Sequence, residues 1–376
     1  MRKTVAVIFG GKSCENEISV LTGVFVLNLL DKEKYQPFPI YVHTDGGAYT
    51  SPKMTGLDVF KEKRYSSFER IIIDGGSVYA MNAAKGRVKR LAKIDVALNC
   101  CHGGLGEGGG VSAWMEWNSI PLASPDLTSS GAFLDKGLTK ILMRSFNVPT
   151  VEYIRIRERD YPRRAAFLLR TVEERLKYPV VVKPAKLGSS IGISVANNEE
   201  EFKRALDTAF CLDDCAVVEK FLPNKKDVNC AAYSLNGEIF VSEPECAFGA
   251  GIYSFEEKYV KRTTDGETAA ICGKGGSRCA LNGELREKIR AYTRTVYKRM
   301  NMQGIVRMDF LVSENKAYLC EVNTVPGSLA YYLFCERLTD ARNLFSALLE
   351  DALARGGAQK TPVQTGILRT VRWHGK

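Results

Sequence analysis

Arg307-Met308-Asp309 and Glu321-Val322-Asn323-Thr324-Val325-Pro326-Gly327 are two polar stretches, and each belongs to an apolar run that is typical of a β-strand. Adjacent strands would bring the side chains of Asp309, Glu321 and Asn323 toward one point. Two carboxylates and an amide are oxygen ligands that suit Mg²⁺ bridging the phosphates of a nucleoside triphosphate. The two stretches therefore predict phosphoryl chemistry, with solvated acids at strand ends as the alternative.

The length and composition indicate a multidomain globular protein. The chain has 376 residues, 45% hydrophobic and 26% charged, which predicts two or three domains with substantial cores. No apolar run reaches membrane-spanning length, and residues 1–11 are typical of a first strand and its turn rather than a signal peptide, so we expect a cytoplasmic protein without a membrane partner.

Eleven cysteines without a CxxC pair predict reduced thiols that serve as small core residues, not a zinc site or a disulfide framework. A catalytic Cys100 or Cys101 beside His102 is the alternative, but the apolar run 94–98 before them favours core packing.

The charge favours anionic partners. Lys and Arg number 53 against 43 Asp and Glu, a net charge of +10. The chain has no aromatic-rich RNA signature and no zinc-finger spacing, so a nucleotide site with a solvated surface explains the charge better than a nucleic-acid partner. The basic tail, residues 356–376, keeps nucleic-acid binding open as an alternative.

The first third of the chain alternates strand-like and helix-like segments. Strands near 5–9, 38–42 and 96–100, with a helix near 17–30, predict a parallel sheet flanked by helices. Glycine-rich loops follow the first and last of these strands. Since ligands bind such sheets at the carboxyl ends of the strands, both loops are expected to face one crevice.

We predict an N-terminal α/β domain over residues 1–134, a central subdomain over 135–226 and a C-terminal domain over 227–355, followed by the basic tail. The loop 247–276 is longer than a plain connection inside a compact domain, and such loops often close over active sites. We expect it to be a lid, with a surface excursion as the alternative.

A glycine- and serine-rich loop, residues 183–192, follows a buried strand. Gly188 and Gly192 allow close backbone approach, and Ser189 and Ser190 offer hydroxyls and amides to phosphate oxygens. The loop is not a Walker A motif, because no Gly-Lys-Ser/Thr opens a helix. Another apolar strand ends in Glu219-Lys220-Phe221-Leu222-Pro223, whose backbone could bind an adenine edge.

In this order, the motifs resemble those of the D-alanine–D-alanine ligase family of the ATP-grasp superfamily, over residues 5–352. The matching motifs are Gly10-Gly11-Lys12-Ser13 with Glu17-Ile18-Ser19, His102-Gly103-Gly104-Leu105-Gly106-Glu107, Asp135-Lys136, the loop 183–192, Glu219-Lys220, Glu257-Lys258-Tyr259, and the two stretches quoted first. The resemblance implies three domains, with a parallel sheet flanked by helices followed by a two-domain α+β ATP-grasp fold.

The resemblance also implies a reaction. ATP phosphorylates the carboxylate of a first D-amino acid, and the amine of a second displaces phosphate to form a dipeptide, as in cell-wall precursor synthesis. The resemblance implies two Mg²⁺ ions, which Mn²⁺ could replace, and we expect a homodimer that acts on small molecules.

The family pattern assigns roles to residues that match its motifs. The implied nucleotide ligands are Lys136, Lys183 and Ser190 at the phosphates, Glu219, Lys220 and Leu222 at the adenine, and Asp227 at the ribose. The implied metal ligands are Asp309, Glu321 and Asn323.

The same pattern assigns the amino-acid sites. Glu17 would pair with the first ammonium, with His102 nearby, and Ser189 and Tyr259 would join Glu17 in a hydrogen-bonded chain that fastens the lid. Arg307 and the Gly327 N–H would stabilise the oxyanion, and Lys258 would meet the second carboxylate or the transferred phosphate. The alternatives are a helix-dipole role for Glu17, a turn role for His102 and a lid-surface role for Lys258 and Tyr259.

Three departures from the family pattern concern amino-acid recognition or the lid. Tyr332 stands where the family has a serine that grips the second substrate or the lid, the glycine motif reads Gly106-Glu107-Gly108-Gly109, and the Pro-Ala that closes the lid is missing. The alternatives are therefore a ligase with another amino-acid or peptide acceptor, or a nucleotide-binding homologue without catalysis.

Overall fold

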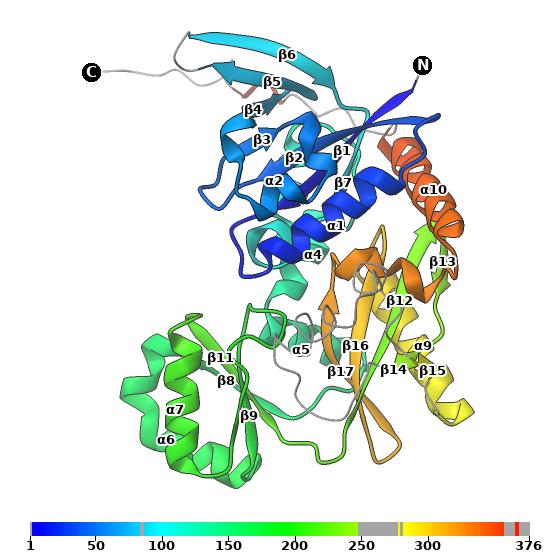
Figure 1. The fold of residues 1–376 in the computed structure, drawn as a ribbon. Helices are drawn as coiled ribbons and strands as arrows, with labels where there is room; N and C mark the ends of the chain where they lie inside the picture. Colours follow the sequence, from blue (N-terminus) through cyan, green and yellow to red (C-terminus); the bar gives the residue numbers. More distant parts are fainter. Residues whose placement is uncertain (1, 83–85, 247–276, 279–280, 357–364, 368–376) are drawn as a thin grey trace.

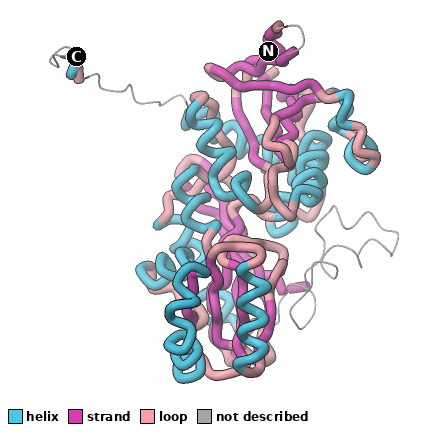
Figure 2. The backbone as a smooth tube through the Cα atoms, turned by 90° about the vertical axis from the view of Figure 1, so that its left-hand side faces the viewer, coloured by secondary structure: helices cyan, strands magenta, loops and turns pink. Residues whose placement is uncertain are grey.

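The structure is a computed structural model that describes residues 2–82, 86–246, 277–278, 281–356 and 365–367. Its strands form three sheets of seven, four and six strands within these residues. Figures 1 and 2 show an elongated molecule with the seven-stranded sheet at one end and helices α6 (Tyr161–Arg175) and α7 (Glu199–Phe210) at the other.

The N-terminal part builds the seven-stranded sheet. Its elements are β1 (Lys3–Gly10), α1 (Asn16–Leu29), β2 (Tyr35–Val42), β3 (Ala48–Thr50), α2 (Asp58–Lys61), β4 (Glu69–Asp74), β5 (Ser77–Asn82), β6 (Arg87–Lys93), β7 (Val96–Asn99), α3 (Val111–Trp117) and α4 (Leu127–Leu134). The order is β6-β5-β4-β3-β2-β1-β7. β1 is buried on both faces from Val5 to Phe9, as expected of a central strand that pairs in parallel with β2 and β7.

The sheet is parallel only at β2, β1 and β7. Strands β3 to β6 extend it as antiparallel pairs, a region that the sequence did not predict. The reason is visible in β4, where Ile71 and Ile73 are buried and Ile72 between them is exposed. That alternation is typical of an antiparallel sheet with one solvated face.

The central part builds an antiparallel four-stranded sheet covered by two helices. Besides α6 and α7 it contains β8 (Tyr153–Arg157), β9 (Val180–Pro184), β10 (Ser194–Ala196) and β11 (Cys215–Lys220), in the order β10-β9-β11-β8. Val182, Phe202 and Val218 lie in its separate apolar core.

The C-terminal part builds the six-stranded sheet. It contains β12 (Lys226–Leu235), β13 (Glu238–Val241), β14 (Glu245–Cys246), β15 (Ser277–Arg278), α9 (Gly283–Arg299), β16 (Val306–Ser313), β17 (Lys316–Asn323) and α10 (Leu338–Gly356). Helix α5 (Lys136–Ser145) packs on the core of this sheet through Met143. Helix α10 returns to the N-terminal part, where the Tyr35 hydroxyl donates to Glu350 at 2.7 Å (Figure 1).

Eight cysteines of the described chain are free thiols, as predicted. Cys246 is disulfide-bonded, so the prediction of reduced thiols was wrong at this position. Among the described residues, no helix combines the length and the apolar character needed to cross a bilayer.

The predicted α/β class, a helix-flanked N-terminal sheet followed by an α+β part, is confirmed: the first sheet contains parallel strands, and two further sheets follow it. The domain boundaries at residues 134/135 and 226/227 stay predictions. The predicted lid, residues 247–276, and most of the basic tail lie outside the described residues.

We expect Phe202→Ala to destabilise the central core by about 3–5 kcal/mol, because the ring is fully buried and its loss leaves a cavity. Lys203→Ala is the matched control on the same helix: its ion pair with Glu199 is exposed, so the substitution should leave the free energy of unfolding nearly unchanged. Urea unfolding followed by circular dichroism measures both. Equal effects of the two substitutions would contradict the assigned core.

Candidate active site

One face of the β16–β17 pair carries the polar residues that were quoted first. In the antiparallel register Arg307 lies opposite Asn323 and Asp309 lies opposite Glu321. Since side chains alternate along a strand, these four share one face, while Met308 is buried on the other. The predicted convergence of the two strands is therefore what the structure shows.

Cations neutralise both carboxylates on this face. Arg307 donates from Nε and Nη2 to Asp309 at 2.7 and 2.8 Å, and Asn323 Nδ2 donates to the same carboxylate at 3.1 Å. Lys136 Nζ lies 3.4 Å from Glu321 and donates to the Leu187 carbonyl at 2.5 Å.

This donor set fits Mg²⁺ shared with a nucleotide. The oxygen donors are two carboxylates and one amide. Among the described residues no group of three or more acidic, histidine or cysteine side chains could hold a metal without help. Mg²⁺ keeps six oxygen ligands and is often bound by one or two carboxylates together with phosphate oxygens and water. Asp309, Glu321 and Asn323 match that mode of binding.

A buried ion triad lies behind this face. Glu219 Oε1 is 2.8 Å from Lys140 Nζ, and Glu219 Oε2 is 2.6 Å from Lys183 Nζ. Burial alone would raise the pKa of the Glu219 carboxyl, but the charges of Lys140 and Lys183 outweigh it and lower the pKa to about 2. Glu219 was predicted at the adenine, whereas its carboxylate holds Lys183. The sequence interpretation missed Lys140.

The other predicted nucleotide ligands lie nearer the surface. Lys220, the last residue of β11, is exposed, and Leu222, which follows the strand, is partly buried. Asp227 pairs with Lys225 at 2.6 Å.

The loop 183–192 bends back at its two serines. Ser189 and Ser190 have φ of 51° and 60°, and Gly192 has φ of 73°. The Ser189 hydroxyl donates to the carboxylate of Glu15. The loop therefore touches the start of α1, in a different part of the chain.

Glu15, not Glu17, is the acid at this contact. Glu17 lies in the first turn of α1 and is exposed, whereas Glu15 directly precedes the helix and lies against the loop. A Cβ at Gly188 would lie 2.8 Å from Glu15 Oε2, so any other residue at this position would require the carboxylate to shift. The predicted contact between Glu17 and Ser189 is corrected, because Ser189 binds Glu15 instead. Glu15 lies just before the helix begins, whereas Glu17 lies in its first turn and is exposed.

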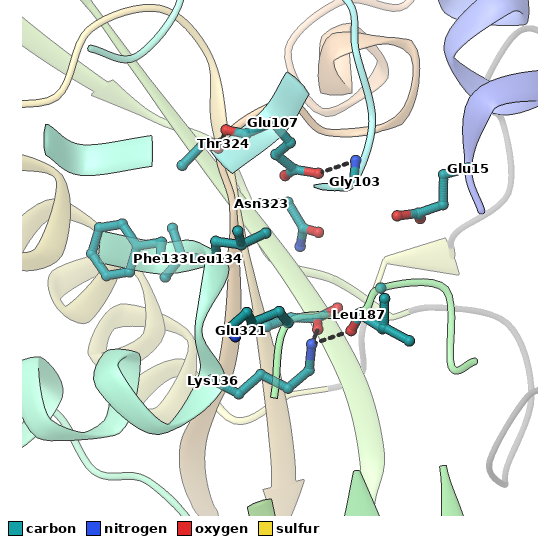
Figure 3. Close-up of a pocket in the computed structure, with 13 residues that line it drawn as sticks. Glu15, Gly103, Glu107, Phe133, Leu134, Lys136, Leu187, Glu321, Asn323 and Thr324 are labelled. Atoms are coloured by element: carbon teal, nitrogen blue, oxygen red, sulfur yellow. Dashed lines mark hydrogen bonds and ion pairs between the residues drawn. The ribbon is translucent and has the colours of Figure 1, made fainter. Parts of the chain in front are cut away.

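These elements enclose one pocket. Its lining comes from the N-terminal part (Glu15, Gly103, Glu107), the loop 183–192 (Lys186, Leu187, Gly188), the end of β17 (Glu321, Val322, Asn323, Thr324), and Phe133, Leu134 and Lys136. Figure 3 shows the Glu15 and Glu107 carboxylates and the Asn323 amide directed toward one space.

Glu107 was not among the predicted site residues. Burial raises the pKa of its carboxyl to about 7, a hydrogen bond from the Gly103 N–H opposes the rise, and the Glu15 charge adds to it. Its place in the quoted glycine motif was the signal that could have identified it.

His102 does not line the pocket. Its Nδ1 lies 2.7 Å from the Val325 carbonyl and its Nε2 lies 2.8 Å from the Thr22 hydroxyl. Burial lowers the pKa of His102 to about 4, so the ring is neutral near pH 7. Its predicted place near the ammonium of the first amino acid stays a prediction.

The remaining predicted residues divide into two groups. Tyr332 accepts a hydrogen bond from Arg307 Nη1 at 3.4 Å. A Cβ at Gly327 would meet no atom of the described residues within 4 Å. Lys258 and Tyr259 lie outside the described residues.

We expect Glu219→Gln to lower the free energy of unfolding by about 3–5 kcal/mol near pH 7, because it leaves two buried lysines without a counter-charge. The folded pKa of Glu219, about 2, lies below its usual value of 4.5. The stabilisation is thus complete above the usual value and is lost as the pH falls through the folded pKa. The difference between wild type and variant should shrink from pH 5 to pH 2.

Urea unfolding at several pH values measures this difference. Glu200→Gln, in an exposed ion pair with Arg204, is the control and should change stability by less than about 0.5 kcal/mol. A difference for Glu219→Gln that stays constant with pH would contradict the ionised triad.

Comparisons with known proteins agree with this architecture. Residues 4–125 match the model of the D-Ala–D-Ala ligase N-terminus and residues 142–353 match that of the C-terminus. The D-alanine–D-alanine ligase of Thermosipho africanus is 32% identical over 334 residues, 88% of each chain.

Two solved structures share the fold. The D-alanine–D-alanine ligase of Coxiella burnetii has a TM-score of 0.76 at 23% identity, over 98% of this chain and 99% of that one. The VanG D-Ala:D-Ser ligase of Enterococcus faecalis has a TM-score of 0.72 at 22% identity, over 95% and 100%. From the two matching family models and the close relative, the chain belongs to the D-alanine–D-alanine ligase family.

Proposed function

We propose that this protein is an ATP-dependent ligase that joins two D-amino acids, most simply two D-alanines, through an acyl phosphate. One observation carries the proposal: a single pocket combines acids that suit an ammonium, lysines that suit phosphates and a carboxylate–amide set that suits Mg²⁺. Membership of the family supports the same reaction.

The nucleotide would lie between the central and C-terminal sheets. Lys136 and Lys183 would neutralise its phosphates, and Ser190 would donate to them. Lys220 and Leu222 would contact the adenine, with Asp227 at the ribose. Glu219 would act through Lys183, because its carboxylate already binds that ammonium at 2.6 Å.

Two Mg²⁺ ions, which Mn²⁺ could replace, would be held by Asp309, Glu321 and Asn323 together with phosphate oxygens. Bound there, they would neutralise charge on the phosphates. Arg307 now pairs with Asp309, and Lys136 lies near Glu321. Both cations would then be free to turn toward the anionic substrate.

The first amino acid would bind by its ammonium to Glu15, which takes the role that the family pattern assigned to Glu17. The Ser189 hydroxyl already donates to that carboxylate and fixes its direction. Lys258 and Tyr259 keep their proposed roles in a lid over residues 247–276.

The chemistry would proceed in two displacements. A carboxylate oxygen of the first amino acid attacks the γ-phosphorus of ATP, and ADP leaves. The neutral amine of the second then attacks the acyl carbon, the C–O bond to phosphate breaks, and the amine gives up a proton as the amide forms. Arg307 and the Gly327 N–H would stabilise the oxyanion between these events, while positioning supplies much of the acceleration.

The second amino acid, which acts as the acceptor, would be selected near Tyr332. Tyr332 places a phenol 3.4 Å from Arg307 Nη1, in the space where the family pattern has a serine hydroxyl. The larger ring narrows the acceptor subsite, which favours a small second substrate and leaves an acceptor other than D-alanine as the alternative.

We further propose a cytoplasmic homodimer that acts on small molecules, divided into domains at residues 134/135 and 226/227. ATP is a cytoplasmic substrate, which supports the location. A nucleotide pocket that contains Lys136 helps to explain the positive net charge of the chain without a nucleic-acid partner.

Glu15→Gln should lower kcat/KM for D-alanine roughly 10- to 100-fold, the usual effect of losing a charge-assisted hydrogen bond, with little change in KM for ATP. Glu17→Gln, two residues away and exposed, is the matched control and should behave as wild type. Phosphate release measures both. A larger effect of Glu17→Gln would restore the original assignment.

Asp309→Asn should lower kcat about 100-fold or more by removing a charged metal ligand. Glu314→Gln, in the exposed turn between the same strands, is the control. Phosphate release is measured for pairs drawn from a panel of D- and L-amino acids. If no pair stimulates the wild type, the ligase proposal fails and the non-catalytic nucleotide-binding alternative gains support.

A further inference from the structure

The segment from Thr324 to Ser328, which carries Gly327, is held by side chains of the N-terminal part. We propose that Thr22, His102 and Glu107 are positioning residues that clamp this segment and so fix the direction of the Gly327 N–H. The inference rests on the proposed function, in which that N–H meets the oxyanion.

The Val325 carbonyl fixes which atom donates and which accepts in each hydrogen bond along the chain from Val325 to Ser328. The Val325 carbonyl can only accept, so His102 Nδ1 carries the proton at this 2.7 Å contact. In the neutral ring Nε2 is then an acceptor, and the Thr22 hydroxyl donates to it at 2.8 Å. The oxygen of Thr22 in turn accepts the Ser328 N–H at 3.3 Å.

This chain closes around Gly327. It begins at the Ser328 amide, passes through Thr22 and His102, and ends at the Val325 carbonyl. Only Pro326 and Gly327 lie between those two backbone groups, and proline has a fixed φ. Both ends of the short segment are thus anchored to the same pair of side chains.

Glu107 holds the same segment from the other side. Its Oε1 accepts the Val325 N–H at 3.2 Å, and its backbone carbonyl accepts the Thr324 hydroxyl at 3.3 Å. The Val325 residue is therefore bound at its N–H by Glu107 and at its carbonyl by His102. Such a grip restrains rotation of the peptide units on either side.

The backbone after Gly327 also indicates an imposed conformation. Ser328, Leu329 and Ala330 have φ of 50°, 53° and 48°, so three successive residues with side chains adopt the left-handed region. L-residues visit that region at a cost, and a run of them persists only where surrounding contacts determine it. The clamp supplies such contacts at the first of the three.

The clamp is anchored on α1. Ser19 Oγ accepts the His102 N–H at 2.7 Å and donates to the Cys100 carbonyl at 3.0 Å, which fixes His102 in turn. Ser19 and Thr22 are three residues apart, so they lie on one stripe of the helix. Glu15, which would meet the first substrate, directly precedes the same helix, so the two proposed sites share one element.

The test compares Thr22→Val, which removes the hydroxyl at nearly constant volume, with Thr22→Ser, which keeps it. Thr22→Val should lower kcat roughly 10- to 100-fold, the scale of a small misplacement of a reacting group, while KM for ATP stays within about twofold. Thr22→Ser should stay within about threefold of wild type. A merely structural role would not separate kcat from KM or be rescued by serine.

Amide hydrogen exchange gives a second readout that needs no turnover. Thr22→Val should speed exchange of the Ser328 amide and leave that of the Leu319 amide, bonded to Pro149, unchanged. If the Thr22→Val variant does not fold, the same measurements are made on the His102→Gln variant. Wild-type kcat in Thr22→Val, or equal losses in Thr22→Val and Thr22→Ser, would overturn the clamp.

The two proposals can fail separately. If the wild type shows no amino-acid-dependent phosphate release, the proposed function fails and exchange alone decides the clamp. Faster exchange at Ser328 would then support it, and unchanged exchange would overturn it.

Discussion

Charge pairing away from water is the constraint on which the site depends. An unpaired ion in a protein interior is costly, so Lys140 and Lys183 need Glu219, and Asp309 needs Arg307. The buried triad holds two ammonium groups and one carboxylate, which leaves one positive charge uncompensated within it. A polyanionic ligand beside Lys183 would supply the missing negative charge. The ion triad would thus prepare the proposed phosphate site, while Glu219 offsets part of the positive charge in the ligand-free protein.

Local periodicity made part of the site predictable. Alternation along β16 and β17 places Arg307 with Asp309 and Glu321 with Asn323, and the hairpin brings both pairs to one face. The assignments that failed depend on contacts distant in sequence. Which of Glu15 and Glu17 faces the loop depends on the residue at which α1 begins, and the sequence predicts such a boundary only to within one or two residues. Lys140 follows Lys136 by one helical turn, and only packing against Glu219 distinguishes it from a surface lysine.

The same distinction explains the fold. The run from Val5 to Phe9 is apolar throughout and could be assigned to a central strand. Strand β4 alternates exposed and buried residues, and β6 is largely exposed. Neither pattern tells which sheet a strand joins, and β4 to β6 extend the N-terminal sheet as antiparallel strands. His102 is a further case. The neighbouring glycines suggested a turn or a ligand contact. In the structure the His102 ring is buried, and both of its nitrogens have hydrogen-bond partners.

The wall of the proposed acceptor subsite is built from the same interior as the clamp. Tyr331 is buried and stacks on Phe25 of α1 with ring centroids 5.2 Å apart, and Tyr332 packs edge-on against Tyr331 at 6.1 Å. The phenol beside Arg307 is therefore supported by the N-terminal core. Packed cores resist small displacements, so a substrate too large for this space would have to displace several rings at once. Selection of the second substrate would then depend on fixed packing, and replacing Tyr332 alone would change the subsite without changing the wall behind it.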